Sequence, residues 1–299
     1  MPTLNADPSL FYPMTVEQVM NQEPIPVLDH GYVRYIAQLG DDLTPLEAAR
    51  MSTGNPTGVD PAKDASTRDF LWRNAHATPF EMAVLQVEVQ VPIFVAREWH
   101  RHRTMSYNEF SGRYAEMPAL YYQPDLERVQ GQSQTNKQAS GTELDPGIKQ
   151  RFLSSLAEDQ EAIRSHYEGY LEDGIARELA RINLPLSQYT RFRAQANLRN
   201  WFHFLELRMA PNAQYEIRVY AQAIARLIQH LWPATWAVFE EHTLHSARLS
   251  RTERDLLRSL LQEALGAEDE SALAATLSDR IGTALPAGRK RELLAKLGL

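Results

Sequence analysis

The sequence predicts an α+β fold in which a central, largely antiparallel sheet is flanked by helices, with a C-terminal helical extension. Two segments, 85–91 and 188–197, alternate between apolar and other residues with the period of two that marks a half-buried strand. Apolar residues between 217 and 231 instead recur at the spacing of an amphipathic helix. Beyond about residue 245 leucines return at helical spacing in three short runs, which predicts the extension.

The first elements are predicted from the placement of prolines and apolar residues. Residues 1–27 contain five prolines and are expected to form an irregular arm, with a short helix near residues 15–20. A strand is expected over 30–39. Pro45 suits the first turn of a helix, where a backbone N–H has no partner within the helix. Residues 68–75 are expected to be helical.

The middle of the chain carries clearer signals. Pro92 ends the first alternating strand and can open a helix that runs to about Arg101. Residues 128–147 are rich in Gln, Ser, Gly, Asn and Thr, so an exposed loop is expected there. A helix is predicted over 146–172. The strand at 188–197 has one polar face, which is either wet or lines a ligand site.

These elements divide the chain into three parts. Residues 1–27 form the arm, residues 28–245 the main domain, and residues 246–299 the helical extension. Residues 241–299 contain nine acidic and nine basic residues, so the extension shows no nucleic-acid signature.

Composition limits the class of protein. At 299 residues, with 43% apolar and 23% charged residues, the chain can fold around a substantial core. It shows neither a run long enough to span a bilayer nor a leader, so we expect a cytoplasmic protein without a membrane partner. Its lack of cysteine excludes disulfides, thiolate metal sites and a cysteine nucleophile, and its histidines lack ligand spacing, so no metal is expected. The net charge of −7 disfavours nonspecific nucleic-acid binding.

One short segment, Arg101–Tyr114, concentrates groups that bind anions. It holds three arginines, a histidine, a carboxylate and a glycine. Guanidinium groups repel one another unless an anion lies between them, and their planar fork matches phosphate oxygens in pairs. Glu109 can balance only one of the three. The segment is therefore predicted to receive phosphate, although the helix dipole alone also favours cations at the end of a helix.

The order of residues in this segment resembles the signature of flavin-dependent thymidylate synthases. That signature is Arg-His-Arg followed after seven residues by Ser, and Arg101–Ser111 meets it in full. The string at 76–81, Arg181 and the Asn-x-Arg at 197–199 also match, and the resemblance covers about residues 28–240. It implies methylation of dUMP to dTMP, with methylenetetrahydrofolate as carbon donor, reduced FAD as hydride source and NADPH as reductant of the flavin.

The resemblance also implies a set of site residues. Those expected to contact FAD are His76, Thr78, Arg101, His102, Arg103, Glu109, Asn197, Arg199, His203 and Asn212. Those expected to contact dUMP are Glu98, Glu109, Ser111, Gly112, Arg113, Arg181 and Arg208. Arg208 and Ser111 are expected in the catalytic centre. Arg208 would stabilise negative charge that spreads into the uracil ring, and Ser111 would bind phosphate rather than act as a nucleophile, since no companion base is evident.

Two positions depart from the family pattern. Many members have glutamine where this chain has Glu98, whose carboxylate would repel a phosphate unless Arg97 or another cation neutralises it, or unless it accepts a proton. His203 and Asn212 exchange the Asn and His that members often place at these positions. The arginines at 191 and 193 are interpreted as surface or ion-pairing residues.

Two other functions fit the same arginines. A nucleotide-binding flavin reductase would oxidise NADPH without methyl transfer. A nucleotide- or nucleic-acid-binding module would bind in a salt-dependent way without oxidising NADPH. The resemblance further implies a homotetramer in which several chains build each active site, so motifs on distant helices need not meet within one chain.

Overall fold

The computed structural model describes residue 18 and residues 21–132 and 140–299. Most of the arm expected over 1–27 lies outside this part of the chain, together with the short helix expected there and the centre of the loop expected after residue 128.

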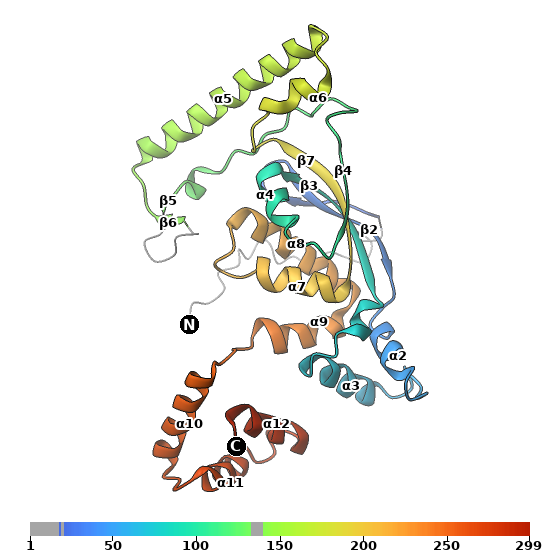
Figure 1. Ribbon diagram of the computed structural model, residues 1–299, viewed down its shortest axis with the longest axis vertical. Coiled ribbons are helices and arrows are strands. Elements are labelled where there is room, and N and C mark those ends of the chain that lie inside the picture. Colours follow the sequence, from blue (N-terminus) through green and yellow to red (C-terminus); the bar gives the residue numbers. More distant parts are fainter. Residues whose placement is uncertain (1–17, 19–20, 133–139) are drawn as a thin grey trace. The chain divides into compact units, whose positions relative to one another are not determined.

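A five-stranded antiparallel sheet forms the centre of the first of two compact units, Met1–Leu244 (Figure 1). The strand order is β1-β2-β3-β7-β4, with bounds Ile25–Val27, Gly31–Leu39, Val84–Pro92, Tyr189–Asn197 and Ser106–Glu109. Neighbouring strands are antiparallel throughout this sheet, so the predicted fold class is confirmed. The two alternating segments of the sequence are the adjacent strands β3 and β7.

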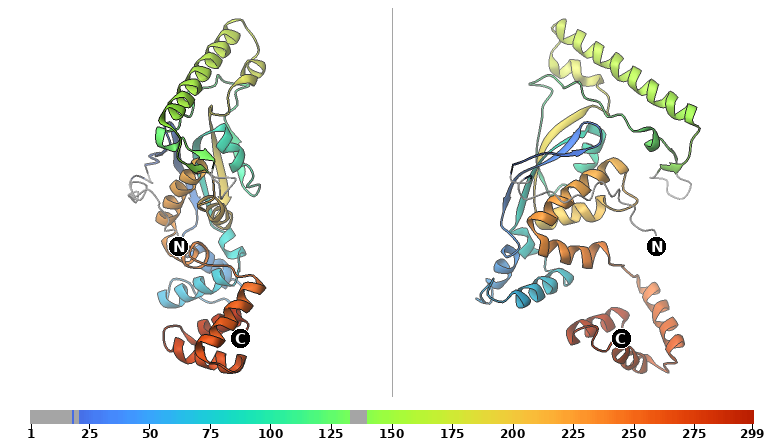
Figure 2. Two further views of the ribbon diagram at one scale, coloured as in Figure 1. Left: turned by 90° about the vertical axis from the view of Figure 1, so that its left-hand side faces the viewer. Right: turned by 180° about the vertical axis from the view of Figure 1, so that it is seen from behind.

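The apolar face of the sheet packs against helices. The alternating apolar side chains of β3, from Leu85 to Val91, have no exposed surface. The helices α4, α7 and α8 share this core and have the bounds Ile93–Trp99, Leu198–Arg208 and Tyr215–Leu231. Figure 2 shows α7 and α8 side by side along the sheet. Tyr220 of α8 donates its hydroxyl to the backbone oxygen of Gln90 in β3 at 2.6 Å, which ties the helix to the sheet.

A helical hairpin follows β2. Its segments α2, α3 and the 3₁₀ turn η2 have the bounds Thr44–Arg50, Pro61–Arg73 and Thr78–Glu81. α3 begins well before the helix expected over 68–75, because the Asp60 side chain accepts the backbone N–H groups of Ala62 and Lys63 and caps it. A small core joins the three segments and consists of Leu46, Leu71 and Phe80.

A long helix, α5 (Pro146–Glu172), lies beyond one end of the sheet, and α2 and α3 lie toward the other (Figure 1). The helical turn α6 (Arg177–Ala180) and the 3₁₀ turn η4 (Arg181–Asn183) lead from α5 toward β7. The described flanks of the expected loop before α5 pair as two short strands, β5 (Gly131–Gln132) and β6 (Ser140–Thr142). These described flanks are therefore less irregular than their composition indicates.

The first unit ends with α9 (Pro233–Phe239) and one turn of π-helix. The second unit, His245–Leu299, consists of α10, α11 and α12, with bounds Arg251–Leu265, Glu270–Ile281 and Ala287–Leu297. Ser250 and Glu253 form a capping box that starts α10. Across the described ranges, the helices are all too short or too polar to cross a membrane.

Candidate active site

The turn between α4 and β4 carries the Arg-His-Arg signature and is fixed through its backbone. The Tyr107 hydroxyl donates to the backbone oxygens of Trp99 and His102, at 3.2 and 2.8 Å. Burial raises the pKa of Tyr107 to about 12, so this donor keeps its proton at neutral pH. The turn is thus held in one shape, in which His102 is buried while Arg101 and Arg103 are exposed.

Arg208, the last residue of α7, is joined to α4 and to this turn by three hydrogen bonds. Its Nε donates to Nε2 of His102 at 2.9 Å. Its Nη1 donates to the Glu98 carboxylate at 3.2 Å, and its Nη2 donates to the Glu98 backbone oxygen at 3.3 Å. The cation that pairs with Glu98 is therefore Arg208, which the sequence separates from it by 110 positions.

Burial shifts the pKa of both partners of Arg208. It lowers the pKa of the His102 imidazole to about 4, and the nearby Arg208 and His203 contribute to the fall. It also raises the pKa of the Glu98 carboxyl, with Arg208 opposing this rise and Glu216 adding to it. His102 is therefore neutral at physiological pH, and because its Nε2 accepts a hydrogen bond, we place its proton on Nδ1.

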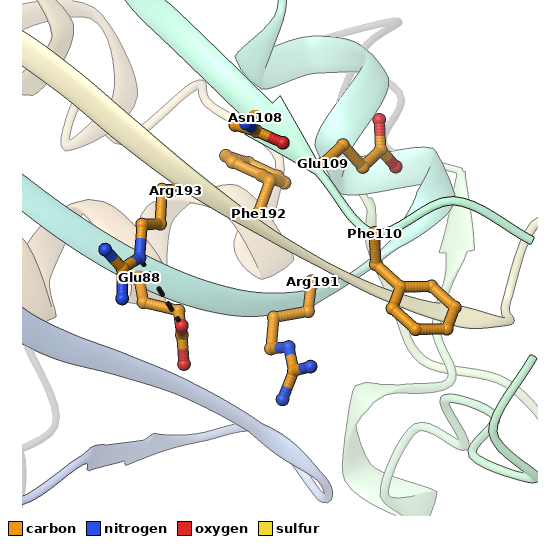
Figure 3. Close-up of a pocket in the computed structure, with 7 residues that line it drawn as sticks. All are labelled: Glu88, Asn108, Glu109, Phe110, Arg191, Phe192 and Arg193. Atoms are coloured by element: carbon orange, nitrogen blue, oxygen red, sulfur yellow. Dashed lines mark ion pairs between the residues drawn. The ribbon is translucent and has the colours of Figure 1, made fainter. Parts of the chain in front are cut away.

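A cavity of about 380 Å³ lies where β4 meets β7 (Figure 3). Its lining residues are Glu88, Asn108, Glu109, Phe110, Arg191, Phe192 and Arg193. The strand register places Arg193 opposite both Glu88 and Asn108, and its Nε lies 3.8 Å from a Glu88 carboxylate oxygen. Thr190 donates its hydroxyl to the Glu109 carboxylate at 2.6 Å. The cavity therefore presents charges of both signs.

The second half of the signature meets Arg181. At Gly112, a Cβ atom would lie 2.8 Å from Sδ of Met117 and 3.0 Å from Cδ of Arg181, so glycine permits this close approach. Beside it, Nε of Arg113 lies 3.6 Å from a carboxylate oxygen of Glu178. Residues far apart in the sequence thus come together around Gly112.

The motif at 76–81 meets the start of α7. Nε of Arg199 lies 3.7 Å from a carboxylate oxygen of Glu81. Asn197 caps α7, because its side chain accepts the backbone N–H three residues on at 3.0 Å. His76 and Thr78 border a cavity of about 830 Å³ whose other lining residues, from α2, α3, η2 and the segments that directly follow or precede them, are mostly apolar.

The contacts of the predicted residues define three groups rather than one. The Arg101 end of the signature meets Arg208, its Ser111 end meets Arg181, and the motif at 76–81 meets Arg199.

Several of the predicted residues are exposed. They include Arg101, Arg103, His203 and Asn212, and neither of the first two forms an ion pair within the described residues. The ring of His203 lies 6.1 Å from that of His102, measured between centroids, so it still borders the group around Arg208.

Sequence reasoning did not place Glu88, Arg191 and Arg193 at a site. The available signal was the polar face over 188–197, which left open a wet surface or a ligand site. The cavity at β4 lies beside this face. Glu88 could not be found in this way, because its place beside Arg193 depends on the register between strands.

Comparisons with known proteins cover most of the chain. A family model described as "Thymidylate synthase complementing protein" matches residues 34–234, which include every predicted site residue. The flavin-dependent thymidylate synthase of Thermus thermophilus is 49% identical over 237 residues, which cover 79% of this chain and 86% of that protein. The flavin-dependent thymidylate synthase of Wolbachia pipientis is 43% identical over 236 residues, with coverages of 79% and 83%.

A solved structure is also similar. It is the UMP/dUMP methylase PolB from Streptomyces cacaoi bound with 5-Br dUMP, which superimposes with a TM-score of 0.66 at 31% sequence identity. The match covers 73% of this chain and 98% of that chain.

Proposed function

This chain belongs to the family of flavin-dependent thymidylate synthases, and we propose that it converts dUMP to dTMP with methylenetetrahydrofolate as carbon donor and NADPH as reductant of bound FAD. When bound, reduced FAD supplies the hydride that completes the methyl group. The observation that carries this proposal is the fixed guanidinium of Arg208 beside the complete Arg-His-Arg signature, because a held cation is what a base that gains negative charge requires.

The residues present fit FAD. Arg101 and Arg103 are exposed and form no ion pair within the described chain, so the N–H groups of their guanidinium ends are available to a pyrophosphate. Arg199 is a third cation of this set, and the cavity bordered by His76 and Thr78 offers the mostly apolar walls that suit a ring system. The further FAD contacts proposed by resemblance are His102, Glu109, Asn197, His203 and Asn212.

The group around Gly112 fits the phosphate of dUMP. Arg181 and Arg113 supply cations, and Gly112 lets the Arg181 side chain lie against the backbone. The Ser111 hydroxyl accepts the backbone N–H of Arg113 at 3.3 Å, which leaves its own proton available to a phosphate oxygen. We assign Ser111 to phosphate binding rather than to nucleophilic attack. The resemblance adds Glu98 and Glu109 to the dUMP contacts.

Replacing Gly112 with alanine should weaken dUMP binding. The new Cβ would lie closer to Met117 and Arg181 than van der Waals contact allows. The aliphatic part of the Arg181 side chain would have to move, which would misplace its guanidinium. Loss of one charged hydrogen bond, worth about 1.5–3 kcal/mol, should raise KM for dUMP about 10–100-fold. Gly288→Ala is the matched control, because no atom lies within 4 Å of its added Cβ. An unchanged KM in Gly112→Ala would contradict the assignment of this group.

Arg208 is the proposed catalytic cation. As the uracil ring becomes nucleophilic, negative charge spreads over it, and a guanidinium already fixed in place stabilises that charge without reorganising. Glu98 balances the charge of Arg208 before substrate arrives, since the two are 3.2 Å apart.

We also propose a homotetramer with active sites shared between subunits. The support is the separation of the predicted residues into three groups of contacts, together with exposed arginines at 101 and 103 that a neighbouring subunit's site can use.

Mass-spectrometric product analysis tests the proposed function. Purified protein should be yellow, and dTMP should form only when dUMP, methylenetetrahydrofolate and NADPH are all present. NADPH should bleach the flavin faster when dUMP is added. Bleaching without dTMP would instead favour a nucleotide-binding flavin reductase. Colourless protein that takes up no FAD would refute both.

A further inference from the structure

Three hydrogen bonds leave Arg208 with two N–H groups for a ligand. An arginine has five N–H donors, and here Nε and one N–H on each terminal nitrogen are bound. The side chain is 21% exposed, so the guanidinium is largely enclosed but not sealed. A long flexible side chain has thus been given a single orientation before any substrate is present.

His102 fixes the guanidinium of Arg208 from one side. Its Nε2 can accept from Arg208 only while the ring is neutral, and burial keeps it so. The ring lies edge-on against Phe204, with centroids 4.8 Å apart, and the backbone oxygen of His102 accepts the Tyr107 hydroxyl. Both the ring and the main chain of His102 are therefore fixed by neighbours on separate elements.

Glu98 fixes the guanidinium of Arg208 from the other side. It contacts Arg208 twice, through its carboxylate and through its backbone oxygen, which lies in the last turn of α4 and also accepts the backbone N–H of Arg101 at 3.3 Å. Substitution of the side chain removes the first contact and leaves the second. The two contacts can therefore be separated by mutation.

We propose that Glu98 and His102 are positioning residues that clamp Arg208 from two sides, so that its two remaining N–H groups meet the pyrimidine ring of dUMP. This inference rests on the proposed function. The resemblance implies that Glu98 contacts dUMP and that His102 contacts FAD. The inference differs from it, because it assigns to both side chains an effect on the reacting base that is exerted through Arg208 rather than by direct contact. Misplacing a catalytic group by about 1 Å can cost about 10²-fold in rate, so such an effect is measurable.

The test compares variants that remove each contact with variants that restore it. Glu98→Ala and His102→Phe should lower kcat about 10²-fold, with little change in KM for dUMP or in FAD bound per subunit. Glu98→Gln and His102→Gln keep an acceptor oxygen and should recover most of kcat. Glu270→Gln makes the same carboxylate-to-amide change against Arg258 in the second unit and serves as control.

A double-mutant cycle gives the sharpest signature. If Glu98 acts through Arg208, then adding Glu98→Ala to Arg208→Ala should change single-turnover rate by less than about twofold, because the clamped group is already gone. Additive losses in the double variant would overturn the inference. So would a rise in KM for dUMP with kcat unchanged, which is what a direct nucleotide contact predicts.

The pH profile provides an independent readout. The charged and titratable groups that face His102 are Arg208 and His203 on α7, and Glu98 on α4 pairs with Arg208 behind them. The pKa of His102 is about 4, and neutral His102 is the form that holds Arg208. We therefore expect kcat to be at its maximum when the pH is well above 4 and to fall as the pH drops through this value. Burial raises the pKa of Glu98, so protonation of its carboxylate also weakens the hold on Arg208 as the pH falls. The acid limb due to His102 is therefore measured in Glu98→Gln. It should be absent from the double variant Glu98→Gln/His102→Gln, and its persistence there would count against the clamp.

These outcomes separate the inference from its premise. Wild-type protein that forms no dTMP would refute the proposed function and this inference with it. An active wild type whose Glu98→Ala and His102→Phe variants keep full kcat would refute the inference alone. Measuring bound FAD and the dUMP dissociation constant by calorimetry in every variant shows whether a lost rate reflects an unfolded or empty protein.

Discussion

Replacing Arg208 with alanine should leave FAD bound and lower the rate of dTMP formation by about 10²–10³-fold, the cost of removing one donor that stabilises transition-state charge. The loss should appear in kcat, because the interaction strengthens as charge develops on the base. Stopped-flow reduction and single-turnover product analysis measure it. The visible flavin spectrum shows whether the cofactor is still bound.

Arg258→Ala is the control for this variant. Arg258 is as enclosed as Arg208, with side-chain exposures of 22% and 21%, and it also pairs with carboxylates, Asp255 and Glu270, but in the second unit. Its loss should leave turnover unchanged. Full activity in Arg208→Ala, or loss of FAD with no effect on the rate per bound flavin, would show that Arg208 does not stabilise the reacting base.

Replacing Gly31 with alanine should sharply destabilise the first unit. A Cβ atom there would lie 1.9 Å from the Tyr220 hydroxyl and 2.5 Å and 2.9 Å from the backbone oxygens of Val27 and Gln90. These distances are shorter than van der Waals contact allows. To make room, the buried Tyr220 hydroxyl would lose its 2.6 Å hydrogen bond to the backbone oxygen of Gln90. Overpacking and an unsatisfied buried hydroxyl together should cost about 2–6 kcal/mol, measured by urea unfolding.

Gly169→Ala provides the matched comparison. Gly169 lies within α5, and no atom lies within 4 Å of its added Cβ. Alanine is favoured over glycine inside a helix by about 0.5–1 kcal/mol, so this variant should be as stable as wild type or more so. Equal unfolding midpoints for the Gly31 and Gly169 variants would mean that the contact between β2 and α8 is looser than described.

The strongly periodic elements could be predicted from the sequence, because their side chains meet a core on one side only. This holds for β3, for α8 and for the three terminal helices. β4 could not be predicted: its residues, 106–109, are polar and mostly exposed, and the strand exists because its backbone pairs with β7. The short helix α9 also escaped prediction, since seven residues carry too little periodicity.

The sequence proposes a set of site residues but does not indicate which of them pair. It indicated that Glu98 needs a cation or a proton, and only the fold identifies Arg208 as that cation rather than Arg97. The pairing depends on where α4 and α7 end relative to each other, which no local pattern encodes. For the same reason, the place of Glu88 beside Arg193 could not be predicted.

The register of β3, β7 and β4 sets Glu88, Arg193 and Asn108 in one row across three strands. Adjacent strands lie about 4.8 Å apart, so main-chain hydrogen bonds alone fix the spacing of this row, whatever fills the core beneath it. Point substitutions in the interior should leave the row intact. Deletion of a single residue from β7 would turn the side chains beyond it to the opposite face, so changes in chain length endanger this surface more than changes in residue type.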